Sequence, residues 1–154
     1  MAWNSCITHA VLSVMSYVAF FVAAAGGGSY LFVEWYKPLR QLEGFREEMQ
    51  AFRLKANLIY LGIGLAFLGI GMVLGSIGAK SQWGFYWSWN AKQTITLLTW
   101  LYYLAAAALL AVHLVLPKKK LDKLSAALAI GGLPLIAINL VVINFFVATP
   151  HRFL

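Results

Sequence analysis

The chain of 154 residues is 62% hydrophobic and only 11% charged, and its net charge is +7. Soluble domains are about half apolar, with about a quarter of their residues charged, so this composition excludes an ordinary soluble domain. The single cysteine, Cys6, excludes an internal disulfide and a cysteine-only metal site.

Four apolar runs without a charged residue carry the hydrophobic excess, at about 10–33, 58–79, 94–117 and 124–148. Each is longer than the ~20 residues that a helix needs to cross a bilayer. Only a helix satisfies the backbone of such a run in lipid, and the runs are too long for barrel strands. The sequence therefore predicts an all-α integral membrane protein, a four-transmembrane-helix bundle that forms a single membrane domain over 1–154. The first run lacks the basic start of a signal peptide, so we expect it to be retained.

The distribution of basic residues predicts how these helices are oriented. The loops after the first and third helices contain Lys37, Arg40, Arg46, Arg53, Lys55, Lys118, Lys119, Lys120 and Lys123. The opposite side has only Lys80, Lys92 and Arg152, so the positive-inside rule places both termini and residues 80–93 outside. Basic residues at the membrane edge also account for the net charge without a nucleic-acid partner. An inner segment at about 36–56 is expected to form a short amphipathic helix or a helical extension.

The second apolar run is rich in glycine, and its Gly71 and Gly75 form a GxxxG step. Such a step lets another helix approach closely, which is one interpretation. The other is a flat wall beside a bulky planar ligand.

The fourth run contains features that bend a helix or need polar partners. Pro134 follows Gly131 and Gly132, so a kink is expected there. Asn139 and Asn144 should face the bundle interior and find hydrogen-bond partners, because lipid offers none.

The segment 80–93 is referred to below as the Trp-rich loop, and it reads KSQWGFYWSWNAKQ. Its aromatic residues are Trp83, Phe85, Tyr86, Trp87 and Trp89. An aromatic belt at a membrane interface normally uses one or two such residues at a helix end. The higher density here predicts a flat apolar platform at the water boundary, suited to a large planar, amphipathic ligand. An aromatic belt on a packing subunit without a cofactor is the alternative.

The three histidines are candidate ligands. His9 lies at the start of the first apolar run and His151 follows the fourth, so the predicted orientation places both on the side of the Trp-rich loop. Two neutral imidazoles on opposite sides of a plane are a common way to hold haem iron. His113 lies inside the third run near its inner end. A histidine within a span is a functional candidate, and a structural hydrogen bond is the competing interpretation.

Residues 83–94, WGFYWSWNAKQT, resemble the WWD loop of the haem-handling cytochrome c assembly protein family, which reads roughly W-G-x-x-W-x-W-D-P-K-E-T. The following Leu97–Tyr103 also looks like the family's continuation. The resemblance covers nearly the whole chain, as the last four helices of a larger member. Three positions differ, since Asn90 replaces Asp, Ala91 replaces Pro and Gln93 replaces Glu.

The resemblance implies a non-covalent, b-type haem on the outer face, with His9 and His151 as the axial ligands of its iron. The other residues that it assigns to this site are Trp83, Gly84, Tyr86, Trp87, Trp89 and Asn90. It also makes His113 a candidate ligand of a second haem, inside the membrane. The implied function is to hold or present haem for the maturation of c-type cytochromes. The implied setting is a prokaryotic cytoplasmic membrane or an organellar one, with lipid, other membrane subunits and c-type cytochromes or assembly proteins as partners.

The second function that the sequence suggests is a structural or haem-carrying subunit of a larger membrane electron-transfer complex. The loop has lost both acidic groups, and the chain is short. All five acidic residues lie on the predicted inner side, so the outer face offers no carboxylate for acid–base catalysis. The resemblance is compatible with a haem chaperone and with part of a cytochrome c synthase-like system.

Overall fold

A computed structural model describes residues 2–36, 43–116 and 119–143, and every regular element among them is a helix. The elements are α1 (Ala2–Trp35), α3 (Glu43–Trp83), α4 (Ala91–Val115), α5 (Lys119–Gly131), α6 (Leu133–Ala137) and the π-helix η1 (Ile138–Ile143). Four stretches are long and apolar enough to cross a membrane: Ile7–Trp35, Glu47–Trp83, Ala91–Val115 and Lys123–Val141. The all-helical, multi-pass character that the apolar runs predict is therefore confirmed.

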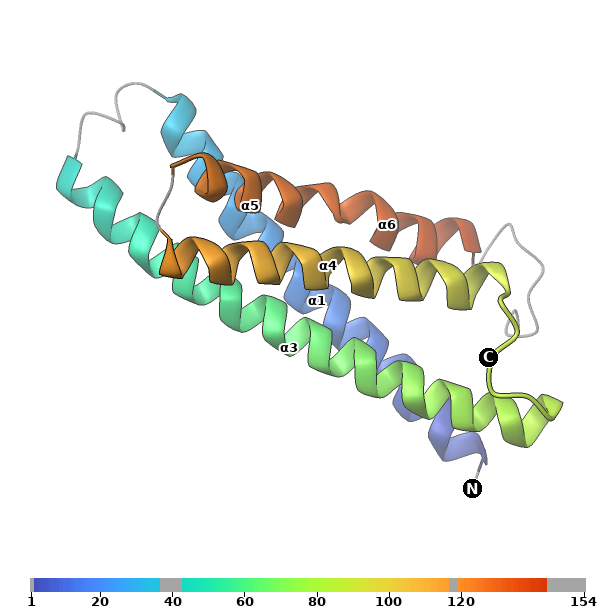
Figure 1. Cartoon of the computed structure of the whole chain (residues 1–154). Helices are drawn as coiled ribbons and strands as arrows, with labels where there is room; N and C mark the ends of the chain where they lie inside the picture. Colours follow the sequence, from blue (N-terminus) through green and yellow to red (C-terminus); the bar gives the residue numbers. More distant parts are fainter. Residues whose placement is uncertain (1, 37–42, 117–118, 144–154) are drawn as a thin grey trace.

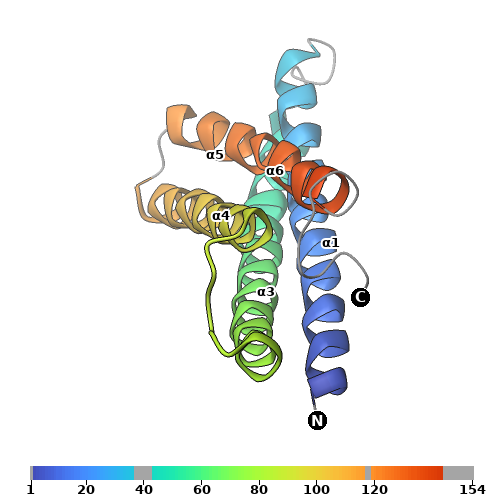
Figure 2. The same ribbon diagram turned by 90° about the vertical axis from the view of Figure 1, so that its right-hand side faces the viewer.

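The helices form one elongated bundle (Figure 1). The long helices α1 and α3 pack against each other along most of their length, and α4 packs on α3 and α5. Figure 2 shows α4 next to α3, while α5 and α6 cross above α4 toward α1, and all three are inclined to the α1–α3 pair. The beginning of α1 lies at the same end of the bundle as the end of α3 and the beginning of α4 (Figure 1), and we call this end the Trp-rich end.

α3 is a single helix of 41 residues, or about 60 Å at 1.5 Å per residue. That length is about twice the hydrocarbon thickness of a bilayer, so part of α3 must extend beyond it. The segment expected over 36–56 is, from Glu43 onward, the first part of this helix, so the helical extension is the form that the structure shows. Residues 37–42 lie outside the described residues.

The fourth membrane-crossing stretch is interrupted where the sequence predicts a kink. α5 ends at Gly131, and Pro134 lies in the first turn of α6. Proline has no N–H to continue the helical ladder. The N–H of Leu135 instead donates to the carbonyl oxygen of Gly132 at 3.1 Å, a shorter-range bond that closes a tighter turn.

Polar groups inside the bundle find partners. The Asn139 side chain on η1 is 3% exposed and donates to the Thr96 hydroxyl at 2.8 Å, which confirms the partner expected for it. The Trp100 indole N–H on α4 donates to the carbonyl oxygen of Leu65 on α3 at 3.0 Å. Asn144 lies outside the described residues.

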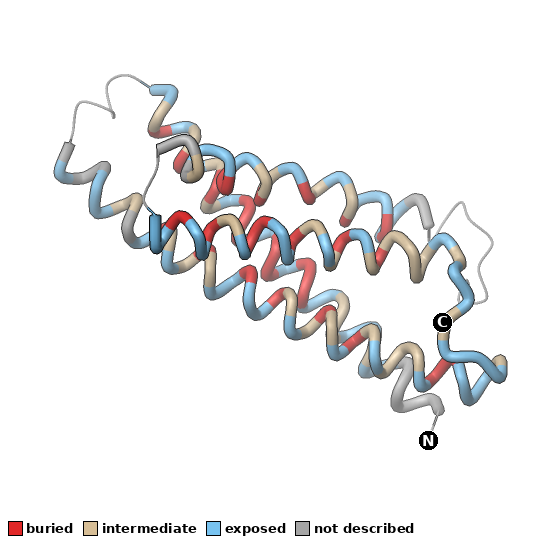
Figure 3. The backbone as a smooth tube through the Cα atoms, viewed as in Figure 1, coloured by how far each residue is buried: buried red, intermediate tan, exposed pale blue. Residues whose placement is uncertain are grey.

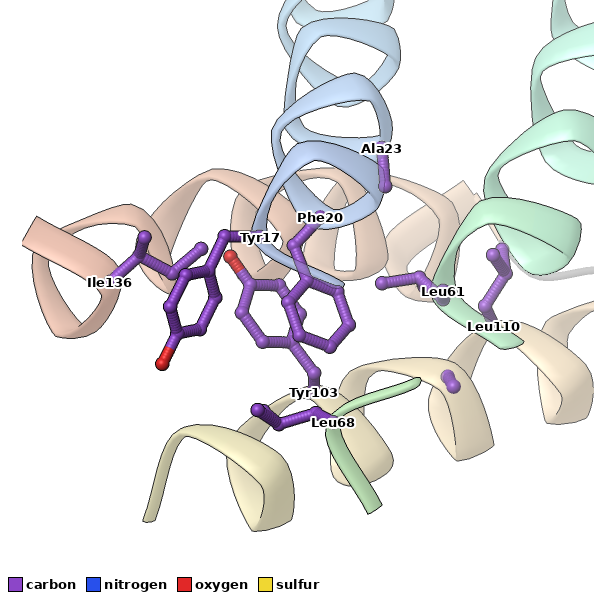
Figure 4. Packing of buried hydrophobic residues seen from close by; sticks show 9 residues of the cluster. Tyr17, Phe20, Ala23, Leu61, Leu68, Tyr103, Leu110 and Ile136 are labelled. Atoms are coloured by element: carbon purple, nitrogen blue, oxygen red, sulfur yellow. The ribbon is translucent and has the colours of Figure 1, made fainter. Parts of the chain in front are cut away.

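The centre of the bundle is a stacked aromatic pair. Figure 3 shows that the buried positions lie on the faces that the helices turn toward one another. There the Phe20 and Tyr103 rings stack with their centroids 3.8 Å apart and their planes 5° apart (Figure 4). A Cβ on Gly64 would lie 2.7 Å from Cδ1 of Phe20, and one on Gly132 would lie 2.8 Å from Cε2 of Tyr103. The pair therefore occupies space that only two glycines leave open.

The end of the bundle opposite the Trp-rich end carries a charged cluster that joins three helices. The Glu34 carboxylate on α1 accepts from the Gln50 amide on α3 at 3.4 Å and lies 3.6 Å from the Lys123 ammonium on α5. The guanidinium of Arg53 is buried 3.9 Å above the centroid of the Tyr30 ring. Charges at this depth are stabilised by such pairing and ring contacts.

The outer surface of the helices is apolar. Val18, Phe21 and Val73 are 59%, 63% and 59% exposed, which is costly in water and favourable against acyl chains. Together with the four stretches of sufficient length, these faces make the chain a multi-pass membrane protein.

Candidate functional site

The connection between α3 and α4 is a short, tightly bonded segment at the Trp-rich end. It runs from Gly84 to Asn90, and the Lys80 ammonium donates to the Gly84 carbonyl oxygen at 2.7 Å. Gly84 has φ +82°, which glycine adopts without steric cost. Trp89 has φ +52°, a left-handed conformation that is uncommon for a bulky residue. Such a conformation persists only where neighbouring contacts hold it.

Those contacts come from a helix cap that Asn90 and Gln93 form together. The Asn90 side chain accepts from the Gln93 backbone N–H at 2.9 Å and donates to the Ser88 hydroxyl at 2.8 Å. The Gln93 side-chain oxygen accepts from both the backbone N–H and the hydroxyl of Ser88, at 2.9 Å each. This is a capping box in which the second side chain reaches two residues further back than usual. The amide oxygens thus accept as carboxylates would, and the Asn90 NH2 group adds a donor bond to Ser88 that a carboxylate lacks.

We expect Asn90→Ala to lower the free energy of unfolding by about 1 kcal/mol, the usual cost of losing an N-cap side chain. Asn90→Asp keeps the acceptor and adds a favourable negative charge at a helix N-terminus but loses the donor bond to Ser88, so it should be more stable than Asn90→Ala. Thermal unfolding in detergent, followed by circular dichroism, measures both changes. An alanine variant as stable as the aspartate variant would show that the cap does not hold the loop.

The aromatic side chains of the Trp-rich loop form two pairs and not one flat surface. Trp83 and Phe85 lie with centroids 6.4 Å apart and planes inclined by 27°. Trp87 and Trp89 meet edge to face, 5.7 Å apart with planes 78° apart. The Trp89 ring is 71% exposed, and Tyr86 lies 5.3 Å from the Lys80 ammonium. The flat platform that the sequence predicts is therefore, in the structure, a set of differently oriented and largely exposed faces.

The indole nitrogen of Trp87 has an unusual environment within this loop. It is buried, and no acceptor among the described residues lies within hydrogen-bonding distance of it. A buried N–H without a partner costs about 1–3 kcal/mol. An acceptor on a bound molecule would satisfy it.

His9 lies within α1, two turns after the start of the helix, and its ring packs against α3. Its Nδ1 lies 2.7 Å from the carbonyl oxygen of Gly71. A carbonyl oxygen only accepts, so Nδ1 carries the hydrogen and Nε2 carries the lone pair. This is the tautomer and the type of partner that metal-binding histidines generally have.

Lys92, in the first turn of α4, brings a positive charge to the surroundings of His9. The ammonium is close enough to interact electrostatically with the imidazole. The N-terminus of α4 at Asn90 also carries partial positive charge. His9 thus contacts α3 at Gly71 and Gly75, and the charge of Lys92 acts on its ring.

One predicted site residue lies elsewhere, and another is outside the described residues. His113 is buried near the end of α4, far from the Trp-rich end, and its Nδ1 has no hydrogen-bond partner among the described residues. This argues against the structural hydrogen bond as the role of that nitrogen. His151 lies outside the described residues, so its role as a second axial ligand stays a prediction. No group of three or more His, Cys, Asp or Glu in the described part of the chain could hold a metal ion.

The sequence pattern of the family described as Cytochrome C assembly protein matches residues 3–151 of the chain, nearly its whole length. The chain belongs to the cytochrome c assembly protein family. This confirms the resemblance carried by the WWD-like loop, and the family is one that handles haem.

Curated relatives in the cytochrome c assembly family match over a shorter part. The cytochrome c biogenesis protein CcsA of Porphyra purpurea is 35% identical over 81 residues, which are 53% of this chain and 24% of that protein. The CcsA protein of Synechococcus sp. (strain CC9605) is 32% identical over 81 residues, 53% of this chain and 25% of that protein. The matched segment therefore spans about a quarter of these relatives. No solved structure matches the chain.

Two features of the surroundings of His9 were not predicted from the sequence. One is the acceptor of the His9 ring N–H, which is a backbone atom and has no signature in the sequence. The other is the charge of Lys92, which acts on the His9 ring. Lys92 lies at helical spacing from three buried residues of α4: Thr96, Thr99 and Tyr103. This spacing predicts that Lys92 lies on the inner face of the helix.

Proposed function

We propose that the chain binds haem at the Trp-rich end and presents it for the maturation of c-type cytochromes. The observation that carries this proposal is the His9 ring, held through Nδ1 by the Gly71 carbonyl at 2.7 Å with the lone pair of Nε2 available. The cytochrome c assembly family and the CcsA relatives support haem handling as the chemistry in which this histidine takes part.

The residues at this end suit haem in three respects. A neutral imidazole with one nitrogen hydrogen-bonded to a carbonyl is a normal iron ligand. The exposed Trp89 ring and the half-buried Trp83 ring offer apolar surface for a macrocycle. The buried N–H of Trp87 and the charge of Lys92 favour an acceptor or anion, and haem carries two carboxylates.

Each residue then has a distinct role in holding haem. His9 would hold the iron through Nε2, and His151 would be the second ligand that the family resemblance implies. Trp83, Gly84, Tyr86, Trp87 and Trp89 provide the surface, and Asn90 fixes the loop through its cap on α4. A non-covalent, b-type haem held by these residues would supply a redox-active iron centre.

The distribution of basic residues supports an orientation in which the Trp-rich end faces outward. With the basic loops inside, both termini and the Trp-rich loop face outward, where c-type cytochromes receive their haem. We propose a prokaryotic cytoplasmic membrane or the corresponding organellar membrane as the location. The partners would be further helices of the assembly system and an apocytochrome.

The buried His113 supports a second haem within the membrane. Its Nδ1 is buried without a partner among the described residues, so a ligand could use it or settle the tautomer. No second histidine at its depth is present in the sequence, so the opposing ligand would come from another chain or segment.

The test is the absorbance of the full chain purified in mild detergent, oxidised and then reduced, with pyridine extraction to count haem. We expect a Soret band with sharp reduced α and β bands, and about one haem per chain; a second haem that His113→Leu removes would assign the membrane site. Folded protein without haem would contradict the proposal. A strain that lacks the protein should also fail to accumulate c-type cytochromes, and normal levels would instead favour a subunit of an electron-transfer complex.

A further inference from the structure

The glycine step of α3 lies directly against the His9 imidazole. A Cβ on Gly75 would lie 3.0 Å from both Cε1 and Nδ1 of His9, and its three nearest atoms would all belong to that ring. A Cβ on Gly71 would instead meet α1 at 3.5 to 3.6 Å, an ordinary contact with Ser13, Leu12 and the His9 backbone. Both glycines therefore face α1, but only the space at Gly75 is filled by the imidazole.

The two glycines contribute different things to His9. Gly71 contributes its carbonyl oxygen, which accepts the Nδ1 hydrogen at 2.7 Å. Gly75 contributes the absence of a side chain, one turn further along the same face of α3. The ring lies over this turn of the helix, so its tautomer and its tilt are set by the same pair of residues.

We propose that Gly71 and Gly75 are positioning residues for the haem-iron ligand His9, an inference that rests on the proposed function. The Gly71 carbonyl keeps the hydrogen on Nδ1, so Nε2 is the nitrogen that binds iron. Hydrogen bonding at Nδ1 also makes Nε2 more basic, which favours the ferric state and lowers the reduction potential. Gly75 allows the ring to come close enough for that bond.

A role in helix packing alone would give a different pattern around Gly75. Where a glycine only lets two backbones approach, its missing Cβ faces the backbone of the other helix, as at Gly27, whose Cβ would lie 2.7 Å from the Ala126 carbonyl oxygen. At Gly75 no backbone atom is among the nearest three. The missing side chain at Gly75 thus makes room for the His9 ring.

The decisive variant is Gly75→Ala, with Gly62→Ala as its matched control. Both replace a glycine inside α3, so both gain the same helix propensity, but a Cβ on Gly62 meets nothing within 4 Å. In the full chain, Gly75→Ala should retain haem about tenfold less tightly, as for other partners of metal-binding histidines. It should also raise the reduction potential and shift part of the spectrum toward high-spin iron, while Gly62→Ala matches the original protein. Equal haem retention, potential and spectrum in the two variants would overturn the inference.

A measurement on haem-free protein separates this inference from the function on which it rests. The ¹⁵N resonances of the His9 ring in detergent should report hydrogen on Nδ1, and Gly75→Ala should increase the share of the other tautomer. Hydrogen on Nε2 in the original chain would overturn the positioning role even if haem binds. If the predicted tautomer is present but the original chain binds no haem under any loading condition, the proposed function fails, and with it the role of these glycines toward iron.

Discussion

Replacing His9 with alanine should remove most of the haem from the purified protein, by about tenfold or more relative to the original chain. The reason is that the replacement deletes a ligand whose other nitrogen is already held by the Gly71 carbonyl at 2.7 Å. Losing even the partner of such a ligand typically costs 10- to 100-fold in affinity. Haem per chain after gel filtration, counted by pyridine extraction, gives the measurement.

The control for the His9 variant is Ile7→Ala, since Ile7 lies two residues away on α1 and is 50% exposed. It should leave haem content unchanged. The variant His9→Gly provides a second control, because added imidazole can occupy the space of the missing ring and should restore the low-spin spectrum. Full haem retention in His9→Ala would remove His9 from the site.

The second large effect is expected at the aromatic pair in the centre of the bundle. Gly132→Val should lower the free energy of unfolding by about 1–3 kcal/mol, the usual cost of overpacking. Gly132 has φ −78° and ψ −16°, which any residue can adopt, so the cost comes from volume alone. A Cβ there would lie 2.5 Å from the Tyr103 hydroxyl oxygen, and Tyr103 is stacked on Phe20 and has no room to withdraw. Unfolding by a denaturing detergent gives the free energy.

Gly62→Val is the matched control for this prediction, because a Cβ on Gly62 meets nothing within 4 Å. We expect it to change stability by no more than about 0.5 kcal/mol. The Gly132 variant should also change the near-ultraviolet circular dichroism that the stacked rings produce. An unchanged spectrum and unchanged stability would show that the bundle opens at this point without cost.

The helical architecture follows from the sequence because charged residues are absent from four long runs, and lipid allows only helices there. The helix ends follow less well. α1 begins at Ala2, ahead of the first apolar run, since polar residues can continue a helix once it leaves the hydrocarbon. The interruption before Pro134 was predictable because a missing N–H is a local property of the residue.

The candidate site follows from the sequence only in its residue types. The spacing of the tryptophans predicted a haem-related loop, and the family match agrees with it. The angle of 78° between Trp87 and Trp89 depends on the left-handed backbone at Trp89, which no pattern of residue types reveals. The partner of the His9 ring is likewise a main-chain oxygen, so only the packing of α1 on α3 identifies it.

The bond from the Trp100 indole to the Leu65 carbonyl has a consequence for how the protein responds to its bilayer. It connects a side chain of α4 to the main chain of α3, and a Cβ on Gly69 would lie 3.3 Å from the Trp100 indole nitrogen. Sliding α4 along α3 would break this bond, whereas tilting both helices together would not. The two helices therefore adapt to a thicker or thinner membrane by tilting together. The distance from the end of α3 at Trp83 to the N-cap of α4 at Asn90 stays the same when the surrounding lipid changes.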